Sequence, residues 1–245
     1  MPKAVLSEKI PVTSADTDVT QNLKPAALIN MFIQVAWHHA DQLGFGEDFL
    51  HSNGLIWMLS RMHIKFDRFP AWNHSITINS WPKGIRRLFY LRDFEATDDE
   101  KRAVARATSE WLIIHREARR PKLYNPNHNV FRENASKNAM ETEVPSLKTP
   151  DGQLSLFERT VEYSDIDLNQ HLTTTRYIDW MLDCFDMEFL VNNSCRELIV
   201  NFIREIPYHR KVCLRQFQVV PDRSFLFEFV STEDGTLFFR GQVNF

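Results

Sequence analysis

Glycine and cysteine are both scarce in this chain of 245 residues, which holds 7 glycines and 3 cysteines. So few glycines argue against a fold built on glycine-rich nucleotide-binding loops. The cysteines (Cys184, Cys195 and Cys213) are odd in number and form no C-x-x-C pair. We therefore expect them to be small buried hydrophobic residues in a reducing compartment.

A long apolar run and a strong net charge are also missing. No segment approaches the roughly 18 apolar residues of a membrane span, and residues 1–10 resemble neither a signal peptide nor a transit peptide. The net charge of −3 gives no general case for nucleic acid binding. The histidines at 38, 39, 63 and 74 lack metal-ligand spacing. We expect a cytosolic protein without metal or cofactor.

The first half of the chain predicts one long helix followed by a run of strands. Lys24-Pro25 opens the helix, because proline is tolerated in the first turn, and Gly44 is placed to end it. Apolar residues cover so much of this helix that we expect neighbours on several sides. Strands are predicted at 5–12, 55–66, 75–81, 88–96 (after a turn at Lys83-Gly84) and 104–115.

A polar segment then separates the two halves. It contains Asn-Pro, Val-Pro and Pro-Asp-Gly sequences, and its apolar residues follow no regular period. We expect a surface linker at 126–152, with a short helix at 131–140, between an N-terminal unit (1–125) and a C-terminal unit (153–245).

The second half repeats the first. A strand at 154–163, a helix at 174–189 and strands at 198–206, 211–220, 224–230 and 236–244 follow in the same order. Asp16 to Leu23 aligns with Asp165 to Leu172, and Phe66 to Pro70 aligns with Ile203 to Pro207.

A helix that precedes antiparallel strands must bury its apolar face on their sheet. A sheet that curls around the helix covers it best. The sequence therefore predicts an α+β protein with a tandem, or double, hot-dog fold. In each half a long helix is wrapped by an antiparallel sheet, and we expect the two sheets to be continuous.

Polar side chains recur at steps of two in Asp167-Leu168-Asn169-Gln170-His171. If this segment is extended, the heads of Asp167, Asn169 and His171 point to one side. The N-terminus of the following helix offers unpaired N–H groups and partial positive charge, which stabilise an oxyanion. Glu205, at an apolar strand end, is the candidate base, because burial raises the pKa of a carboxylate.

This segment has two other interpretations. Asp-x-Asp-x-Asn is common in turns and helix caps that have no catalytic role. It also resembles the start of a calcium loop, but Gln170 and Arg176 stand where that loop requires glycine and glutamate. The repeat favours a catalytic role, since the first half keeps Asp16 and Asp18 but aligns Thr20, Asn22 and Arg68 with Asn169, His171 and Glu205. This predicts one active site, with the first half as a non-catalytic scaffold.

At these residues the sequence resembles the acyl-acyl carrier protein thioesterases of plants and bacteria. The matching segments are 163–171, Tyr177, Trp180, Arg204-Glu205, 84–87, 107–112 and 119–120. The resemblance implies a tandem hot-dog fold and a thioester hydrolase that releases free fatty acid and carrier protein thiol in fatty acid biosynthesis. It places the functional residues at Asp167, Asn169, His171 and Glu205.

Three features depart from the family pattern. Thr173-Thr174 replaces a pair of asparagines, and Ile206 replaces a cysteine that was once proposed as the nucleophile in plant members. The plastid-targeting segment of the plant members is not present, which fits a bacterial cytoplasmic protein.

The resemblance implies further roles in the first half. Phe32, Ile33 and Trp37 are candidate walls of the acyl pocket, with ordinary core packing as the alternative. The acyl-loaded carrier protein is expected to be acidic, so a basic face would dock it, and a solvated strand face explains the same residues equally well. The candidate docking residues are Arg86, Arg87, Arg92, Arg116, Arg119, Arg120 and Lys122.

Several other functions remain open at this point. A coenzyme A thioesterase, another hot-dog enzyme such as a hydroxyacyl dehydratase, or a non-catalytic acyl-binding protein would share the fold. The sequence is compatible with a homodimer but does not set the oligomeric state. Chain length, saturation and the role of Glu205 as base or nucleophile are also not set by the sequence.

Overall fold

The computed structural model describes residues 3–124, 130–152 and 155–245. Part of the expected linker, 126–129, and the first residue of the strand expected at 154–163 lie outside these residues. The chain divides into two compact units, residues 1–144 and 145–245, called unit 1 and unit 2 below. Within the described residues, no helix has both the length and the apolar character needed to cross a bilayer.

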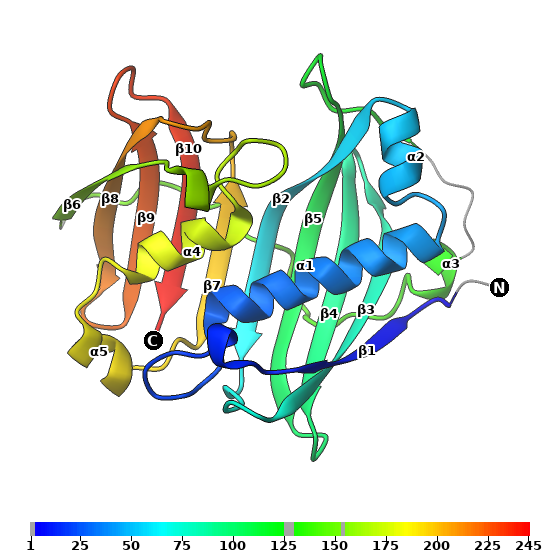
Figure 1. The fold of residues 1–245 in the computed structure, drawn as a ribbon, viewed down its shortest axis with the longest axis horizontal. Coiled ribbons are helices and arrows are strands. Elements are labelled where there is room, and N and C mark those ends of the chain that lie inside the picture. The colour runs from blue at the N-terminus through cyan, green and yellow to red at the C-terminus, as the bar shows by residue number, and fades with distance from the viewer. Residues whose placement is uncertain (1–2, 125–129, 153–154) are drawn as a thin grey trace. The chain divides into compact units, whose positions relative to one another are not determined.

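Unit 1 consists of one long helix on a five-stranded antiparallel sheet. The helix, α1, crosses one face of the sheet (Figure 1). Along the sheet the strands follow the order β1-β3-β4-β5-β2. Their bounds are β1 Leu6–Pro11, β2 Leu55–Phe66, β3 Ser75–Arg86, β4 Phe89–Asp98 and β5 Ala103–His115, and the helices are η1 Ser14–Asp16, α1 Pro25–Gln42, α2 Glu47–Ser52 and α3 Val130–Glu133.

The predicted bounds of the long helix are confirmed. Pro25 is the first residue of α1, and Lys24 precedes it as the N-cap. Gly44 follows the helix with a φ of +76°, which a residue without a Cβ adopts at little cost. Phe32 of α1 is fully buried and stacks on Phe94 of β4, with ring centroids 4.9 Å apart. These contacts hold α1 on the sheet.

Unit 2 repeats the topology of unit 1. Its order is β6-β8-β9-β10-β7, again antiparallel, with α4 across one face (Figure 1). The internal repeat is therefore confirmed. The bounds are β6 Ser155–Thr160, η2 Tyr163–Asp165, α4 Thr174–Leu182, α5 Met187–Asn192, β7 Glu197–Phe202, β8 Lys211–Val220, β9 Ser224–Ser231 and β10 Leu237–Asn244.

The single helix expected at 174–189 is wrong. α4 ends at Leu182, and α5 begins at Met187 after Asp186, whose backbone is extended. This break places the ring of Phe185 against Phe225 and Phe245, with centroids 4.8 and 5.2 Å away. Aromatic packing thus outweighs the continuation of the helix.

The turn expected at Lys83-Gly84 is also wrong. β3 continues to Arg86 through a register shift between Pro82 and Gly84, and the chain reverses at Arg87, which has a φ of +57°. Proline cannot donate a ladder hydrogen bond, so a bulge beside Pro82 lets the strand continue.

The segment expected to be an exposed linker covers the sheet faces that lie opposite the helices. In unit 1, Trp81 Nε1 donates to the Lys137 carbonyl (3.1 Å), and the Ala139 N–H donates to Asp93 Oδ2 (2.8 Å). In unit 2, the Leu147 N–H donates to Asn201 Oδ1 (2.8 Å). Each unit therefore has its helix on one face and a piece of this segment on the other.

A buried polar pair, His39 and Arg92, links α1 to β4 on the face of the unit 1 sheet that α1 covers. His39 is fully buried, its Nε2 lies 2.9 Å from the Lys3 carbonyl, and its Nδ1 lies 3.2 Å from Arg92 Nη1. Since a carbonyl only accepts, Nε2 carries the proton and Nδ1 accepts from Arg92. Burial, together with the positive charge of Arg92, lowers the pKa of His39 from 6.5 to about 4.

This lowered pKa makes stability depend on pH. Between about pH 6.5 and 4 the unfolded chain binds a proton at His39 that the folded chain does not, so the contribution is complete above pH 6.5 and is lost as the pH falls. The free energy of unfolding should fall by roughly 2 kcal/mol more in the wild type than in His39→Gln between pH 7.5 and 5. Glutamine offers an N–H donor and a carbonyl acceptor and does not titrate. Equal pH slopes in urea unfolding would contradict this assignment.

Candidate active site

The polar loop before α4 is closed by the carboxylate of Asp167. Asp167 Oδ1 accepts the N–H groups of Asn169 (2.8 Å) and His171 (3.3 Å). The Gln170 N–H donates to the Asp167 carbonyl (3.0 Å), and Gln170 has a φ of +64°. The loop is an Asx turn, in which an aspartate side chain accepts hydrogen bonds from the N–H groups of the residues that follow it. The extended segment expected here is therefore wrong, because the carboxylate folds the loop back on itself.

Unit 1 contains the same loop. Asp18 Oδ1 accepts the N–H groups of Thr20 (2.8 Å) and Asn22 (3.1 Å), and Gln21 has a φ of +64°. The two loops thus share their backbone and their aspartate. They differ in the side chains that they present, with Thr20 and Asn22 in unit 1 at the positions of Asn169 and His171 in unit 2.

A second loop supplies Glu205, and its backbone shows which residue is equivalent in unit 1. The N–H groups of Ile203 and Arg204 both donate to the Phe238 carbonyl, as those of Asp67 and Arg68 donate to the Val104 carbonyl. The equivalent of Glu205 is therefore the next residue, Phe69. The sequence alignment of Arg68 with Glu205 is wrong by one residue, because it matched the two prolines, which the backbone pairing does not align.

The two loops of unit 2 are joined by backbone pairing. The Leu172 N–H donates to the Ile206 carbonyl (2.8 Å), and His171 pairs with Pro207. As a result, His171 Nδ1 lies 3.6 Å from Glu205 Oε1, and the two side chains are 25% and 27% exposed. Both are within reach of a substrate, and a small movement would bring them into hydrogen-bond distance.

Tyr177 of α4 lies next to the loop that contains Glu205. It is 3% exposed on α4, packs against Phe202, Phe229 and Phe239, and its hydroxyl lies close to the backbone of Ile206, next to Glu205. Burial raises the pKa of Tyr177, so the hydroxyl stays protonated. The sequence placed Tyr177 on the apolar side of the helix, but periodicity gave no sign that its hydroxyl reaches the site.

The helix that follows the loop also differs between the units. α4 begins at Thr174, and the side chain of its N-cap, Thr173, makes no capping hydrogen bond. α1 begins with Pro25, which has no N–H group. The helix start in unit 2 therefore has one more donor to direct at negative charge.

Taken together, unit 2 places a carboxylate, an imidazole and a carboxamide around one pair of loops. A carboxylate beside a histidine is a common arrangement for activating water or moving a proton. The donors at the helix start suit an oxygen that gains negative charge. The Asp167 carboxylate, in contrast, binds the loop backbone.

Unit 1 contains an apolar pocket between α1 and its sheet. Of the three residues expected to line an acyl pocket, Trp37 lies in its wall. Phe32 is fully buried in the core, and Ile33, which is half-buried, is not among the lining residues. The pocket is lined by Ala36, Trp37, Ala40, Phe45, Trp57, Pro82, Tyr90, Leu91, Arg92, Trp111 and Phe131.

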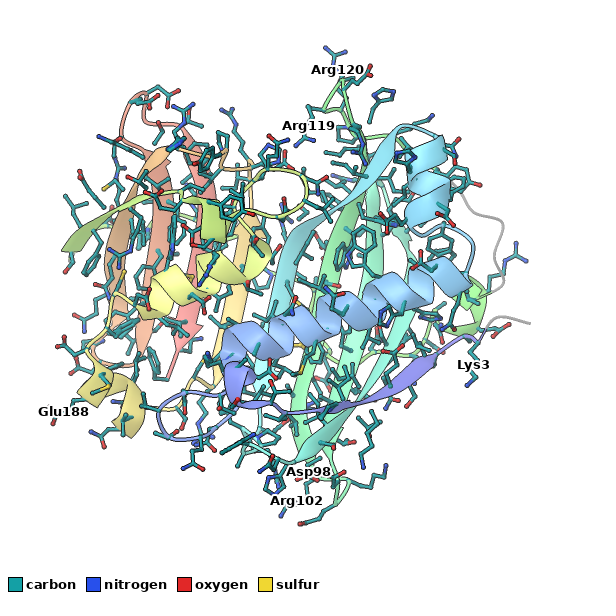
Figure 2. The ribbon with its side chains drawn as sticks, in the orientation of Figure 1. Lys3, Asp98, Arg102, Arg119, Arg120 and Glu188 are labelled. Carbon is teal, nitrogen blue, oxygen red and sulfur yellow. The ribbon has the colours of Figure 1, made fainter. Side chains whose placement is uncertain are left out.

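The expected docking residues fall into three groups. Arg92 is only 7% exposed, so the prediction that it belongs to a docking face is wrong. Arg86 is half-buried and forms ion pairs with Glu110 and Glu143, which raise its pKa. Figure 2 shows Arg119 and Arg120 on the loop after β5, at the opposite end of that strand from Asp98 and Arg102. The exposed members of the set are Arg87, Arg116, Arg119, Arg120 and Lys122.

The architecture defines the class of protein first. It is a tandem hot-dog, and solved structures share it. An acyl-ACP thioesterase from Bacteroides thetaiotaomicron aligns with a TM-score of 0.86 at 24% identity, covering 98% of this chain and 97% of that one. A 12:0-ACP thioesterase from Umbellularia californica aligns with a TM-score of 0.83 at 16% identity, covering 100% and 98%.

The sequence then identifies the family. Residues 3–127 match the acyl-ACP thioesterase N-terminal domain, and residues 149–243 match its C-terminal domain. The chain belongs to the acyl-ACP thioesterase family. It is 25% identical over 224 residues to oleoyl-acyl carrier protein thioesterase 2 (chloroplastic) of Arabidopsis thaliana and 26% over 228 residues to the Coriandrum sativum oleoyl enzyme. It aligns with 59% and 58% of the length of these relatives.

The paired aspartates allow a matched test of the loop. Asp18→Ala and Asp167→Ala each remove an acceptor for two backbone N–H groups, so each should lower the free energy of unfolding by about 1–2 kcal/mol. Urea unfolding of the two variants measures this. A loss in only one of them would show that the two carboxylates are not equivalent in the fold.

Proposed function

We propose that this chain hydrolyses fatty acyl thioesters of acyl carrier protein and releases free fatty acid and the carrier protein thiol. The observation that carries the proposal is the approach of His171 to Glu205 at the two joined loops of unit 2. Unit 1 has the same backbone with Asn22 and Phe69 at these positions. The family match and the names of the relatives supply the substrate class.

In this mechanism the thioester carbonyl lies beside the Glu205 carboxylate. Either a water molecule, deprotonated by Glu205, attacks the carbonyl carbon, or Glu205 attacks first and water then cleaves the acyl-enzyme. The tetrahedral oxyanion accepts hydrogen bonds from Asn169 and from N–H groups at the start of α4. The C–S bond breaks, and His171 passes a proton to the leaving thiolate. Asp167 supports this arrangement by holding the backbone of Asn169 and His171.

The catalytic pair is tested by paired substitutions in the two units. Glu205→Gln and His171→Ala should each lower kcat by about 100-fold or more, since each removes a group that handles a proton. Asn22→Ala, at the position of His171 in unit 1, should leave kcat unchanged. Release of free thiol from acyl carrier protein substrates measures all three. Near wild-type kcat in Glu205→Gln would contradict the assignment.

Oxygen-18 water tests Glu205 as the nucleophile. If Glu205 attacks and water then cleaves the acyl-enzyme anhydride at the Glu205 carbonyl, the label enters the Glu205 carboxylate, which mass spectrometry of the peptide detects. If Glu205 is a base, the label enters only the fatty acid, so label in Glu205 identifies the nucleophile. A panel of acyl-carrier proteins and acyl-coenzyme A esters then sets chain length and carrier preference.

We also propose that the exposed basic residues after β5 dock the acidic carrier protein. Arg119→Glu with Arg120→Glu should raise KM for acyl carrier protein substrates about 10-fold or more and leave KM for uncharged acyl-pantetheine nearly unchanged, because rim charges steer a charged partner. Lys101→Glu, in the turn between β4 and β5, is the control. An equal rise for both substrates would contradict docking at this loop.

A bacterial cytoplasm is the setting we propose for this reaction. Cys184, Cys195 and Cys213 all lie in the described part of the chain and are all free thiols, as reducing compartments keep them. A homodimer remains an expectation, which light scattering of the purified protein would test.

A further inference from the structure

One charged side chain lies in the wall of the apolar pocket of unit 1. Arg92, on β4, is 7% exposed and points to the same face of the sheet as α1. Its Nη1 donates to Ser80 Oγ at 2.9 Å and to His39 Nδ1 at 3.2 Å. Both acceptors are neutral, because serine does not ionise and His39 carries no charge at neutral pH.

The described residues offer Arg92 no anion. Asp93, its neighbour in the chain, points to the opposite face of the sheet and binds Lys83 and the Ala139 N–H. Arginine keeps its charge in proteins, even though burial lowers the pKa of Arg92 to about 9. A buried charge without a counter-ion is costly and is therefore rare away from functional sites.

Three of the other polar side chains around the pocket are already engaged, and the fourth, Trp37, offers one neutral indole N–H. The Tyr90 hydroxyl donates to the Tyr124 carbonyl and accepts its N–H. The indole N–H of Trp57 donates to the Phe45 carbonyl, and that of Trp111 donates to Ser109 Oγ. In the described part of the chain, Nε and Nη2 of Arg92 make no hydrogen bond. Arg92 is therefore the charged group that can recognise a polar atom inside this pocket.

We propose that the pocket of unit 1 binds an acyl chain that carries an acceptor oxygen, and that Arg92 binds this oxygen. The proposal rests on the proposed function in one respect, namely that the occupant is an acyl group. The oxygen belongs to a hydroxyl or oxo group on the chain, or to a carboxylate at its far end. An unsubstituted chain would cover the guanidinium with hydrocarbon and leave its donors unmet.

Binding to Glu205→Gln tests the proposal without turnover. Acyl-pantetheine thioesters of one chain length are titrated, with the tail unsubstituted, hydroxylated or oxidised at successive carbons, or ended by a carboxylate. Quenching of tryptophan fluorescence reports the affinity, since Trp37, Trp57 and Trp111 line the pocket. We expect at least one oxygenated tail to bind roughly 10-fold tighter than the plain tail. The tail that gains most identifies the source of the oxygen.

Substitution of Arg92 assigns this preference to its side chain. In the Glu205→Gln background, Arg92→Met should abolish the preference and raise the melting temperature of the empty protein, because it removes a buried charge. Arg106→Met, at an exposed arginine of β5, should keep the preference. Arg92→Lys, which keeps the charge but loses the planar fork, should weaken the preference and serves if the methionine variant does not fold.

The outcomes separate this inference from the proposed function. Equal binding of plain and oxygenated tails overturns the inference, even if wild-type protein hydrolyses plain acyl carrier protein substrates. A preference that survives Arg92→Met also overturns it, as does a fall in melting temperature with unchanged selectivity, which would assign Arg92 a structural role. A failure of the proposed function appears instead as wild-type protein that releases no thiol from any acyl thioester.

Discussion

A carboxylate that binds two N–H groups of its own loop is the interaction on which the rest of the site depends. In both units it closes the loop between the edge strand and the helix. Without it, a residue such as Gln170, with a φ of +64°, would relax toward a more favourable backbone conformation. In the closed loop the Leu172 N–H donates to the Ile206 carbonyl, and this pairing places His171 beside Glu205. The aspartate therefore positions His171 through the backbone of the loop.

The two units show how one scaffold presents two different sets of side chains. Their sheets have the same strand order, and in both loops the aspartate accepts two backbone N–H groups. In unit 2 the loop residues are Asn169 and His171 and the helix is short, whereas in unit 1 they are Thr20 and Asn22 and the helix is twice as long. The longer helix forms one side of the pocket that contains Arg92. The candidate catalytic residues and the apolar pocket thus belong to different copies of the repeat.

Much of this was predictable from the sequence. The bounds of α1 followed from Pro25 and Gly44, β2 and β8 followed from apolar runs between turn residues, and the family followed from motifs along most of the chain. Two of the errors have a common physical cause, since each required knowledge of contacts between distant residues. Phe185 ends α4 early because of partners on β9 and at the C-terminus. The equivalence of Phe69 and Glu205 is fixed by backbone carbonyls in other strands, which local similarity does not reveal.

The segment that joins the units determines where the chain could be divided into two pieces. Residues 134–139 bind the face of the unit 1 sheet opposite α1, and residues 145–149 bind the face of the unit 2 sheet opposite α4. A break between Val144 and Pro145 would leave each half with its own cover, whereas a break at the more polar stretch near residue 125 would separate the first sheet from part of its shielding. The segment between the two repeats therefore covers one face of each sheet. A two-piece version of this protein is best divided between Val144 and Pro145, where both covering pieces stay with their own sheets.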